Sequence, residues 1–129
     1  MRRAAPALAL LLLVACASAD RCPPRTSSAY VETLYFGTAR PGGVVSAAEF
    51  QAFVDTVIAP RFPAGLTFFE AGGRWRDGSG KTIAEASYVV QLIVAERSDE
   101  AIEAIIRDYK ARFQQESVLR VRTKTCSGV

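Results

Sequence analysis

The order in which strand-like and helix-like hydrophobic patterns follow one another is the sequence feature that most constrains the fold. Four segments have the alternation or the β-branched and aromatic composition of strands, and two have apolar residues at helical spacing. The strand-like segments are residues 29–37, 66–76, 81–95 and 117–125, and the helix-like segments are residues 46–58 and 98–113. This β-α-β-β-α-β order predicts an α+β domain of the ferredoxin-like type, a four-stranded antiparallel sheet with two helices on one face.

The first helix has clear end signals. Ser46 and Glu49 have the spacing of a capping box, in which the serine caps the helix and the glutamate reaches back to the serine amide. Pro60 is predicted to end this helix. Residues 39–45, with proline and two glycines, are predicted to form a loop.

The second and third strands are predicted to form a hairpin. A two-residue loop between Asp77 and Gly80 sets the register of the hairpin, and Gly72 with Gly73 predicts a bulge or bend. The residues then predicted to face the helices are Phe69, Ala71, Trp75, Tyr88, Val90, Leu92 and Val94. Those predicted for the opposite, open face are Phe68, Glu70, Arg74, Glu85, Ser87, Val89, Gln91 and Ile93.

The start of the chain predicts export. After a short basic segment, residues 4–14 form an apolar run of eleven residues, which is too short to span a bilayer and fits a signal peptide. Residues 13–16 (LVAC) resemble a bacterial lipobox, so we favour cleavage before Cys16 and lipidation of that cysteine. The alternative is ordinary secretion, with residues 17–19 (ASA) preceding cleavage before Asp20.

The predicted organisation is a signal peptide over residues 1–19, a tether over residues 20–28 and one α+β domain over residues 29–126. The predicted location is the periplasmic face of a bacterial membrane, reached through a lipid anchor, or the medium after secretion. Ala17, where an aspartate would resemble an inner-membrane retention signal of enterobacteria, favours the outer membrane.

The three cysteines fit this interpretation. If Cys16 carries lipid, Cys22 and Cys126 remain as a pair in an oxidising compartment. Cys22 precedes the first predicted strand and Cys126 follows the last, and these two strands are neighbours in a ferredoxin-like sheet. A Cys22–Cys126 disulfide is therefore predicted, with two free thiols as the alternative.

Composition removes several classes of function. The chain has no histidine, the commonest general base and metal ligand, and three cysteines without histidine cannot complete a four-ligand zinc site. We therefore predict no metal and no cofactor. Without Arg2 and Arg3, fourteen basic residues stand against thirteen acidic ones, so the charge gives no case for nucleic-acid binding.

Polar and aromatic strand residues are the remaining candidates for a site. Glu70 and Glu85, with Arg74 nearby, are either a carboxylate pair for acid–base chemistry or, the interpretation we favour, a solvated cross-strand charge cluster. Glu32 is expected to pair with a basic residue of the last strand. No residue is assigned as catalytic. The candidate open-face or pocket residues are Tyr35, Phe68, Glu70, Arg74, Trp75, Glu85, Tyr88 and Gln91.

Four short segments carry a resemblance to a known family. They are residues 32–37 (ETLYFG), 60–67 (PRFPAGLT), 73–77 (GRWRD) and 115–121 (QESVLRV). Together they resemble an uncharacterised family of small bacterial exported proteins and lipoproteins, described as a domain of unknown function. The resemblance runs from about residue 28 to residue 126 and implies one compact exported domain without assigned site residues.

These observations predict a cell-envelope lipoprotein that acts as a non-catalytic binding or scaffolding module. A second copy or another envelope protein is the expected partner of the open face. The alternative is a small-molecule-binding protein or cofactor-free enzyme of the dimeric ferredoxin-like type, with a concave site among the strand aromatics.

Overall fold

The computed structural model describes residues 21–76 and 78–128, and the predicted signal peptide with Cys16 lies outside these residues. The elements are β1 (Ser27–Gly37), β2 (Ala39–Arg40), β3 (Gly43–Val44), α1 (Ala47–Phe53), β4 (Thr67–Arg76), β5 (Thr82–Val94), α2 (Asp99–Phe113) and β6 (Leu119–Ser127). None of the helices within the described residues has the length and apolar character needed to cross a membrane.

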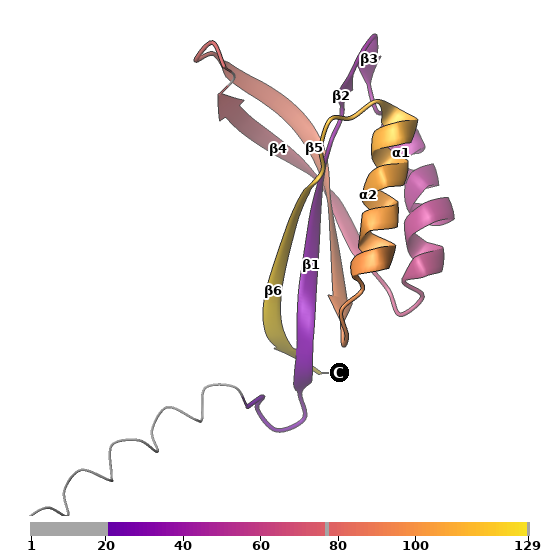
Figure 1. The fold of residues 1–129 in the computed structure, drawn as a ribbon, viewed down its shortest axis with the longest axis vertical. Coiled ribbons are helices and arrows are strands. Elements are labelled where there is room, and N and C mark those ends of the chain that lie inside the picture. The colour runs from indigo at the N-terminus through magenta and orange to yellow at the C-terminus, as the bar shows by residue number, and fades with distance from the viewer. Residues whose placement is uncertain (1–20, 77, 129) are drawn as a thin grey trace, which may run out of the picture.

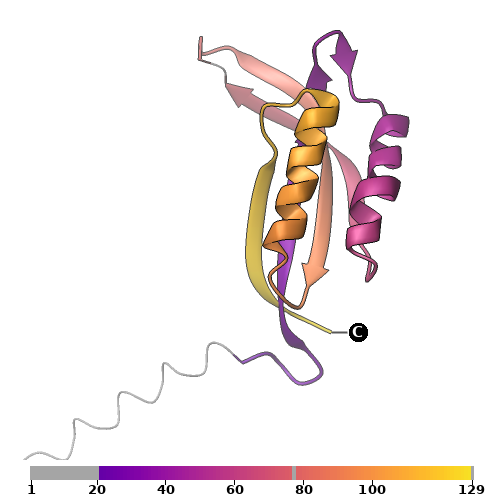
Figure 2. The ribbon, with the colours of Figure 1, turned by 45° about the vertical axis from the view of Figure 1, so that its right-hand side comes forward.

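The main sheet has the order β4-β5-β1-β6, with every neighbouring pair antiparallel. The helices α1 and α2 lie side by side against one face of this sheet and leave the other face uncovered (Figures 1 and 2). The predicted ferredoxin-like α+β fold is therefore confirmed. The small β2–β3 hairpin occupies residues that were predicted to be loop.

The core lies between the sheet and the helices. Leu34 and Phe36 of β1 and Val90 and Leu92 of β5 are fully buried, because alternate strand positions point towards the helices. The helices supply an aromatic layer, in which Phe50 stacks on Tyr88 with ring centroids 4.0 Å apart. The other aromatic members of this layer are Phe53, Tyr109 and Phe113.

The two ends of the first helix are formed in different ways. The capping box is present: the Glu49 amide donates to Ser46 Oγ at 3.3 Å, and the Ser46 amide donates to Glu49 Oε2 at 2.9 Å. Pro60 was predicted to end this helix, and its α- and π-helical segments end at Ile58, before the proline. A π-helical segment (Val54–Ile58) and a 3₁₀ turn (Ala59–Arg61) follow α1, and Pro60 is tolerated near the start of that turn because a missing amide costs little there.

The register of the β4–β5 hairpin differs from the prediction by one residue. Arg76 pairs with Thr82, so five residues connect the strands instead of two, and the pairing runs without a bulge at Gly72 and Gly73. A one-residue slip moves every side chain of β4 to the other face. Phe68, Glu70 and Arg74 therefore lie on the helix side, and Phe69, Ala71, Gly73 and Trp75 lie on the open side.

The predicted disulfide is confirmed. Cys22 and Cys126 are bonded, with their Cα atoms 5.5 Å apart, and Cys126 lies opposite Ser28 in the ladder between β6 and β1. Strand β1 begins at Ser27, two residues earlier than predicted. The bond therefore closes the chain at the pole where β1 begins and β6 ends.

A charge cluster lies under the N-terminus of α2. The fully buried carboxylate of Glu32 accepts hydrogen bonds from Arg120 at 2.8 Å and Arg122 at 2.6 Å, which confirms its predicted pairing with the last strand. The Arg120 hydrogen bonds, followed by those of Arg122, outweigh burial and hold the pKa of Glu32 below its usual range. Asp99 binds the same two arginines, and these bonds lower its pKa to about 2.

Candidate functional site

The open face of the sheet carries large apolar side chains in contact with solvent. We use the name open face for the side-chain positions that point away from the helices in the four long strands. They include Val31, Thr33, Tyr35, Thr67, Phe69, Ala71, Gly73, Trp75, Ile83, Glu85, Ser87, Val89, Gln91, Ile93, Leu119, Val121 and Thr123.

Six of these residues are large, hydrophobic and between 39 % and 61 % exposed. They come from all four strands and are Tyr35, Phe69, Trp75, Ile93, Leu119 and Val121. Glu85 is the one charged residue among the described positions of this face. Depletion of charge around exposed aromatic and aliphatic side chains distinguishes the core of a binding interface from ordinary surface.

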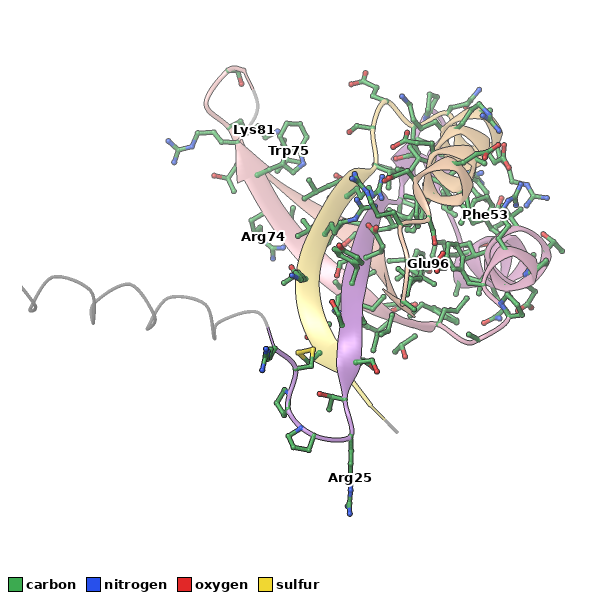
Figure 3. All side chains as sticks on the ribbon, turned by 60° about the horizontal axis from the view of Figure 1, so that its bottom comes forward. Arg25, Phe53, Arg74, Trp75, Lys81 and Glu96 are labelled. Atoms are coloured by element: carbon green, nitrogen blue, oxygen red, sulfur yellow. A yellow bond between two sulfur atoms is a disulfide. The ribbon has the colours of Figure 1, made fainter. Side chains whose placement is uncertain are left out.

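A groove of about 800 Å³ lies at the end of the open face where β1 finishes. It extends across the sheet from Trp75 on β4, past Tyr35 on β1, to Leu119 at the start of β6. The β4–β5 hairpin projects away from β1 and β6 at this end (Figure 1). Trp75 lies on this hairpin, away from the helices, where Phe53 lies (Figure 3). The remaining lining residues are Gly37, Ala39, Gly73, Arg74, Glu85, Ser87, Gln115, Glu116 and Ser117.

Glu85 has a defined position in this groove. Its Oε1 atom accepts a hydrogen bond from the Ala39 amide at 3.3 Å. The approach depends on Gly37, because a Cβ atom at that position would lie 2.8 Å from Glu85 Oε1. Gln115 fixes the same corner from the opposite side, where its amide nitrogen donates to the Ala39 carbonyl at 2.7 Å.

A second, smaller cavity of about 450 Å³ lies between the β4–β5 edge and the start of α1. Glu70 and Tyr88 line it, and the Tyr88 hydroxyl donates to Glu70 Oε1 at 3.5 Å. Burial, together with the neighbouring Glu70 carboxylate, raises the pKa of Tyr88. The hydroxyl therefore stays protonated at neutral pH and acts as a donor.

The structure divides the predicted site residues among four places. Tyr35, Arg74, Trp75 and Glu85 line the groove, and Glu70 and Tyr88 line the smaller cavity. Phe68 was predicted for the open face but packs against Phe50, with ring centroids 5.8 Å apart, because of the register change. Gln91 lies near the middle of the open face, paired with Thr33 and Thr67.

The expectation that Glu70 and Glu85 lie together was wrong. Glu70 pairs with Tyr88 and Glu85 pairs with Gly73, so the two carboxylates point to opposite faces of the hairpin. This removes the carboxylate pair considered for acid–base chemistry. Among the described residues, no three cysteine or acidic side chains gather as a metal site.

Sequence reasoning missed the contributions of Gly37 and Gln115 to the groove. Gly37 ends a strand of large side chains, and such a glycine signals close approach by a neighbouring group. Gln115 lies two residues after the helix, where no periodic pattern assigns a direction to its side chain. The left-handed backbone of Gln114, with φ of 55°, turns the chain at this point.

One family model matches most of the chain. The model of the family described as "Protein of unknown function (DUF3574)" matches residues 31–128. The chain belongs to the DUF3574 family. This family assignment agrees with the resemblance seen in the sequence, and the match covers both helices and the long strands except the first four residues of β1. A search of curated proteins gave no match.

Solved structures share the fold of this DUF3574 protein at low sequence identity. A phage SAM lyase in complex with S-methyl-5'-thioadenosine is 16 % identical, with a TM-score of 0.54 over 86 % of this chain and 95 % of that chain. CutA from Synechococcus elongatus is 10 % identical, with a TM-score of 0.53 over 81 % of this chain and 83 % of that chain.

The periplasmic divalent cation tolerance protein CutA from Archaeoglobus fulgidus is 16 % identical to the DUF3574 chain, with a TM-score of 0.51. That alignment covers 77 % of this chain and 87 % of the other. At these identities the similarity establishes the ferredoxin-like fold and does not transfer a ligand or an activity.

Proposed function

We propose that this protein is a non-catalytic binding module of the bacterial cell envelope that pairs with a second copy of itself through the open face. The observation that carries this proposal is the composition of that face. Six large hydrophobic side chains are exposed there, and the described positions include a single charge, at Glu85. Such a surface gains free energy when it is covered by a similarly apolar surface.

The size of the open face supports a second copy as the partner. Four strands spaced about 4.8 Å apart and about nine residues long cover roughly 600 Å² in projection. A specific protein–protein interface takes about 800 Å² from each partner, so the open face supplies most of one. Because the face is nearly uncharged, two copies also meet there without like-charge repulsion.

Self-association is tested with charge substitutions at exposed positions of the face. Ile93 and Val121 suit this test because both are exposed, whereas Val89 is buried and its replacement by aspartate would unfold the domain. Sedimentation velocity of the Cys16→Ser protein, purified from the periplasm, is expected to show a dimer. Ile93→Asp and Val121→Asp are each expected to weaken it at least about 100-fold, because a charge is buried without a partner.

The control is Ala52→Asp, which adds the same charge to an exposed position of α1. It is expected to leave the dimer intact. A wild-type protein that stays monomeric at about 100 µM, or a dimer that both open-face variants retain, contradicts pairing through this face.

The envelope part of the proposal rests on the sequence before Asp20 and on the disulfide. A Cys22–Cys126 bond forms and persists in an oxidising compartment. With a lipid on Cys16, the full chain is expected in the membrane fraction of a bacterial host, and Cys16→Ser is expected to release it to the periplasm. A Cys16→Ser protein that remains in the membrane fraction excludes the lipid anchor. Recovery of the wild type as a soluble protein supports ordinary secretion instead.

The groove supports a second candidate function, the binding of a small molecule. Its volume of about 800 Å³ lies within the range of ligand pockets, which is about 300–1,000 Å³. A protein of the same fold, the phage SAM lyase, was solved with a bound nucleoside derivative, so this architecture can carry a small-molecule site. This function does not exclude pairing through the rest of the open face.

A further inference from the structure

We propose that the groove binds a small organic cation, such as a quaternary ammonium or a protonated amine, between Trp75 and Glu85, which lies opposite Gly73 on the same face of the hairpin. This inference does not depend on self-association of the open face. It starts from the chemistry of the groove, which combines aromatic walls with a carboxylate that has no basic partner among the described residues.

The aromatic walls come from opposite sides of the groove. Trp75 belongs to the projecting β4–β5 hairpin and is 53 % exposed, and Tyr35 belongs to β1 and is 39 % exposed. Exposed indole and phenol rings attract cations through the negative potential of their faces, and tryptophan does so most strongly. Trp75 lies opposite Ile83 and Tyr35 lies opposite Val89, six residues further along β5, so a small cation beside Glu85 contacts the Trp75 ring.

The carboxylate of Glu85 supplies the opposite charge. Its Oε1 atom is used by the Ala39 amide, and no described protein group hydrogen-bonds to its Oε2 atom. The side chain is half-buried, so an ion pair formed here is less screened by solvent than one on an open surface. The hydrogen bond from the Ala39 amide restricts this side chain before a ligand binds, which lowers the side-chain entropy lost on binding.

The other charges of the groove do not cancel this attraction. Glu116 adds a second carboxylate to the lining. Arg74 is the basic lining residue, but its position alternates with those of Gly73 and Trp75, so its side chain leaves the strand on the other side (Figure 3). One of its guanidinium nitrogens donates to the Gly73 carbonyl at 2.9 Å.

The proposal is testable by fluorescence because Trp75 is the one tryptophan of the chain. The probes are benzyltrimethylammonium and choline, and the neutral comparison is 3,3-dimethylbutan-1-ol, which has the shape of choline without its charge. Both cations are expected to change the Trp75 emission in a saturable manner. The alcohol is expected to bind at least about tenfold more weakly than choline, because it lacks the charge that Glu85 and the Trp75 ring attract.

Two variants assign the binding to the groove. Glu85→Gln keeps the side-chain shape and is expected to weaken binding of both cations at least about tenfold. Gly37→Ala is expected to weaken it as well, because the added methyl group would lie 2.8 Å from Glu85 Oε1 and displace that carboxylate. Glu70→Gln is the matched control, since it removes a carboxylate from the same hairpin on the opposite face.

The proposal is overturned if neither cation changes the fluorescence of the folded wild type at concentrations up to about 10 mM, a level at which even weak millimolar sites are largely occupied. Equal binding of choline and the neutral alcohol, or equal effects of Glu85→Gln and Glu70→Gln, also overturns it. Sedimentation of the same samples separates this result from the proposed pairing. A monomer that binds cations contradicts only the pairing, and a dimer that does not bind them contradicts only the groove.

Discussion

The two faces of the sheet are built from the same four strands but differ in what covers their apolar side chains. On the helix-covered face, Leu34, Phe36 and Val90 are sealed by the aromatic residues of α1 and α2. On the open face, side chains of similar size, such as Phe69 and Ile93, are about half exposed. Apolar character alone therefore does not identify the core of this domain, because only one face of the sheet has a partner within the chain.

Charge is distributed between the faces in the reverse of the usual pattern. The carboxylate of Glu32 is fully buried under α2, where two arginines neutralise it. The solvent-facing side has a single charge, at Glu85, among its described residues. A buried charge is stable only with partners, and an apolar exposed face is stable only as a small patch or under a partner.

Removing a ring from the helix-covered face is expected to cause the largest loss of stability. Phe50→Ala is expected to lower the free energy of unfolding by about 3–5 kcal/mol, because Phe50 is fully buried and stacks on Tyr88. Urea denaturation monitored by circular dichroism measures this loss. A loss below about 1.5 kcal/mol would show that the aromatic layer is loosely packed, since well-packed core phenylalanines cost more than this.

Removing the disulfide is expected to cause the next largest loss of stability. The bond closes a loop with a sequence separation of 104 residues, and the double variant Cys22→Ala/Cys126→Ala is expected to lose about 2–4 kcal/mol. The open face should not change, because the bond lies at the pole of the sheet. Reduction of the wild type with dithiothreitol is the control, and it should lower the urea midpoint to that of the double variant. An unchanged midpoint after verified reduction contradicts the prediction.

Removing the buried charge is expected to cost more stability than removing the charge of the open face. Glu32→Gln is expected to cost about 2–3 kcal/mol, because it leaves Arg120 and Arg122 without their buried partner and with only the more exposed carboxylates of Asp99 and Glu103. Glu85→Gln on the open face is the matched control and is expected to change stability by less than about 0.5 kcal/mol. Similar losses in the two variants would show that burial does not distinguish these carboxylates.

The pH dependence of stability follows from the same cluster. The pKa of Glu32 is lower in the folded than in the unfolded chain, so the unfolded chain binds more protons at acidic pH. The stabilisation is present above the unfolded pKa of about 4.3 and is lost as the pH falls through the folded value. Denaturation curves between pH 6 and about 3 should therefore show a shallower loss of stability in Glu32→Gln than in the wild type. Parallel curves would contradict this assignment.

The smallest expected loss of stability comes from a substitution on the open face. Phe69→Ala is expected to cost no more than about 1 kcal/mol in the monomer, because Phe69 is 46 % exposed and its removal leaves no cavity. The same variant is expected to weaken the proposed dimer. A loss in the monomer as large as that of Phe50→Ala would erase the distinction between the two faces.

The fold was predictable because its signals are local. Tyr88, Val90 and Leu92 occupy every second position of a long strand, and Ser46 with Glu49 marks the start of a helix. Each of these patterns can be recognised within one short segment. Cys22 and Cys126 lie beside the first and last strands, and the predicted topology makes these two strands neighbours. Each of these predictions is therefore a consequence of one segment or of the order of segments.

The site was harder to predict because it depends on register and on loops. The turn residues 77–80 suggested a two-residue loop, and the actual five-residue connection exchanges Phe68 for Phe69 on the open face. That single slip separates Glu70 from Glu85. The groove also needs Gln115, which comes from the loop after α2, and no pattern within that loop indicates its contact with Ala39.

The Cys22–Cys126 bond has a consequence for mechanical load. Strand β1 lies between β5 and β6, and a force on its first residue alone would peel it from both neighbours, one hydrogen-bonded pair at a time. The bond transfers part of that force to the end of β6, which lies at the same pole. The two strands therefore take up the force together, and β1 cannot be peeled from β6 at that end while the bond is intact. A domain held to a surface by its N-terminal side is in this way protected where the pull enters.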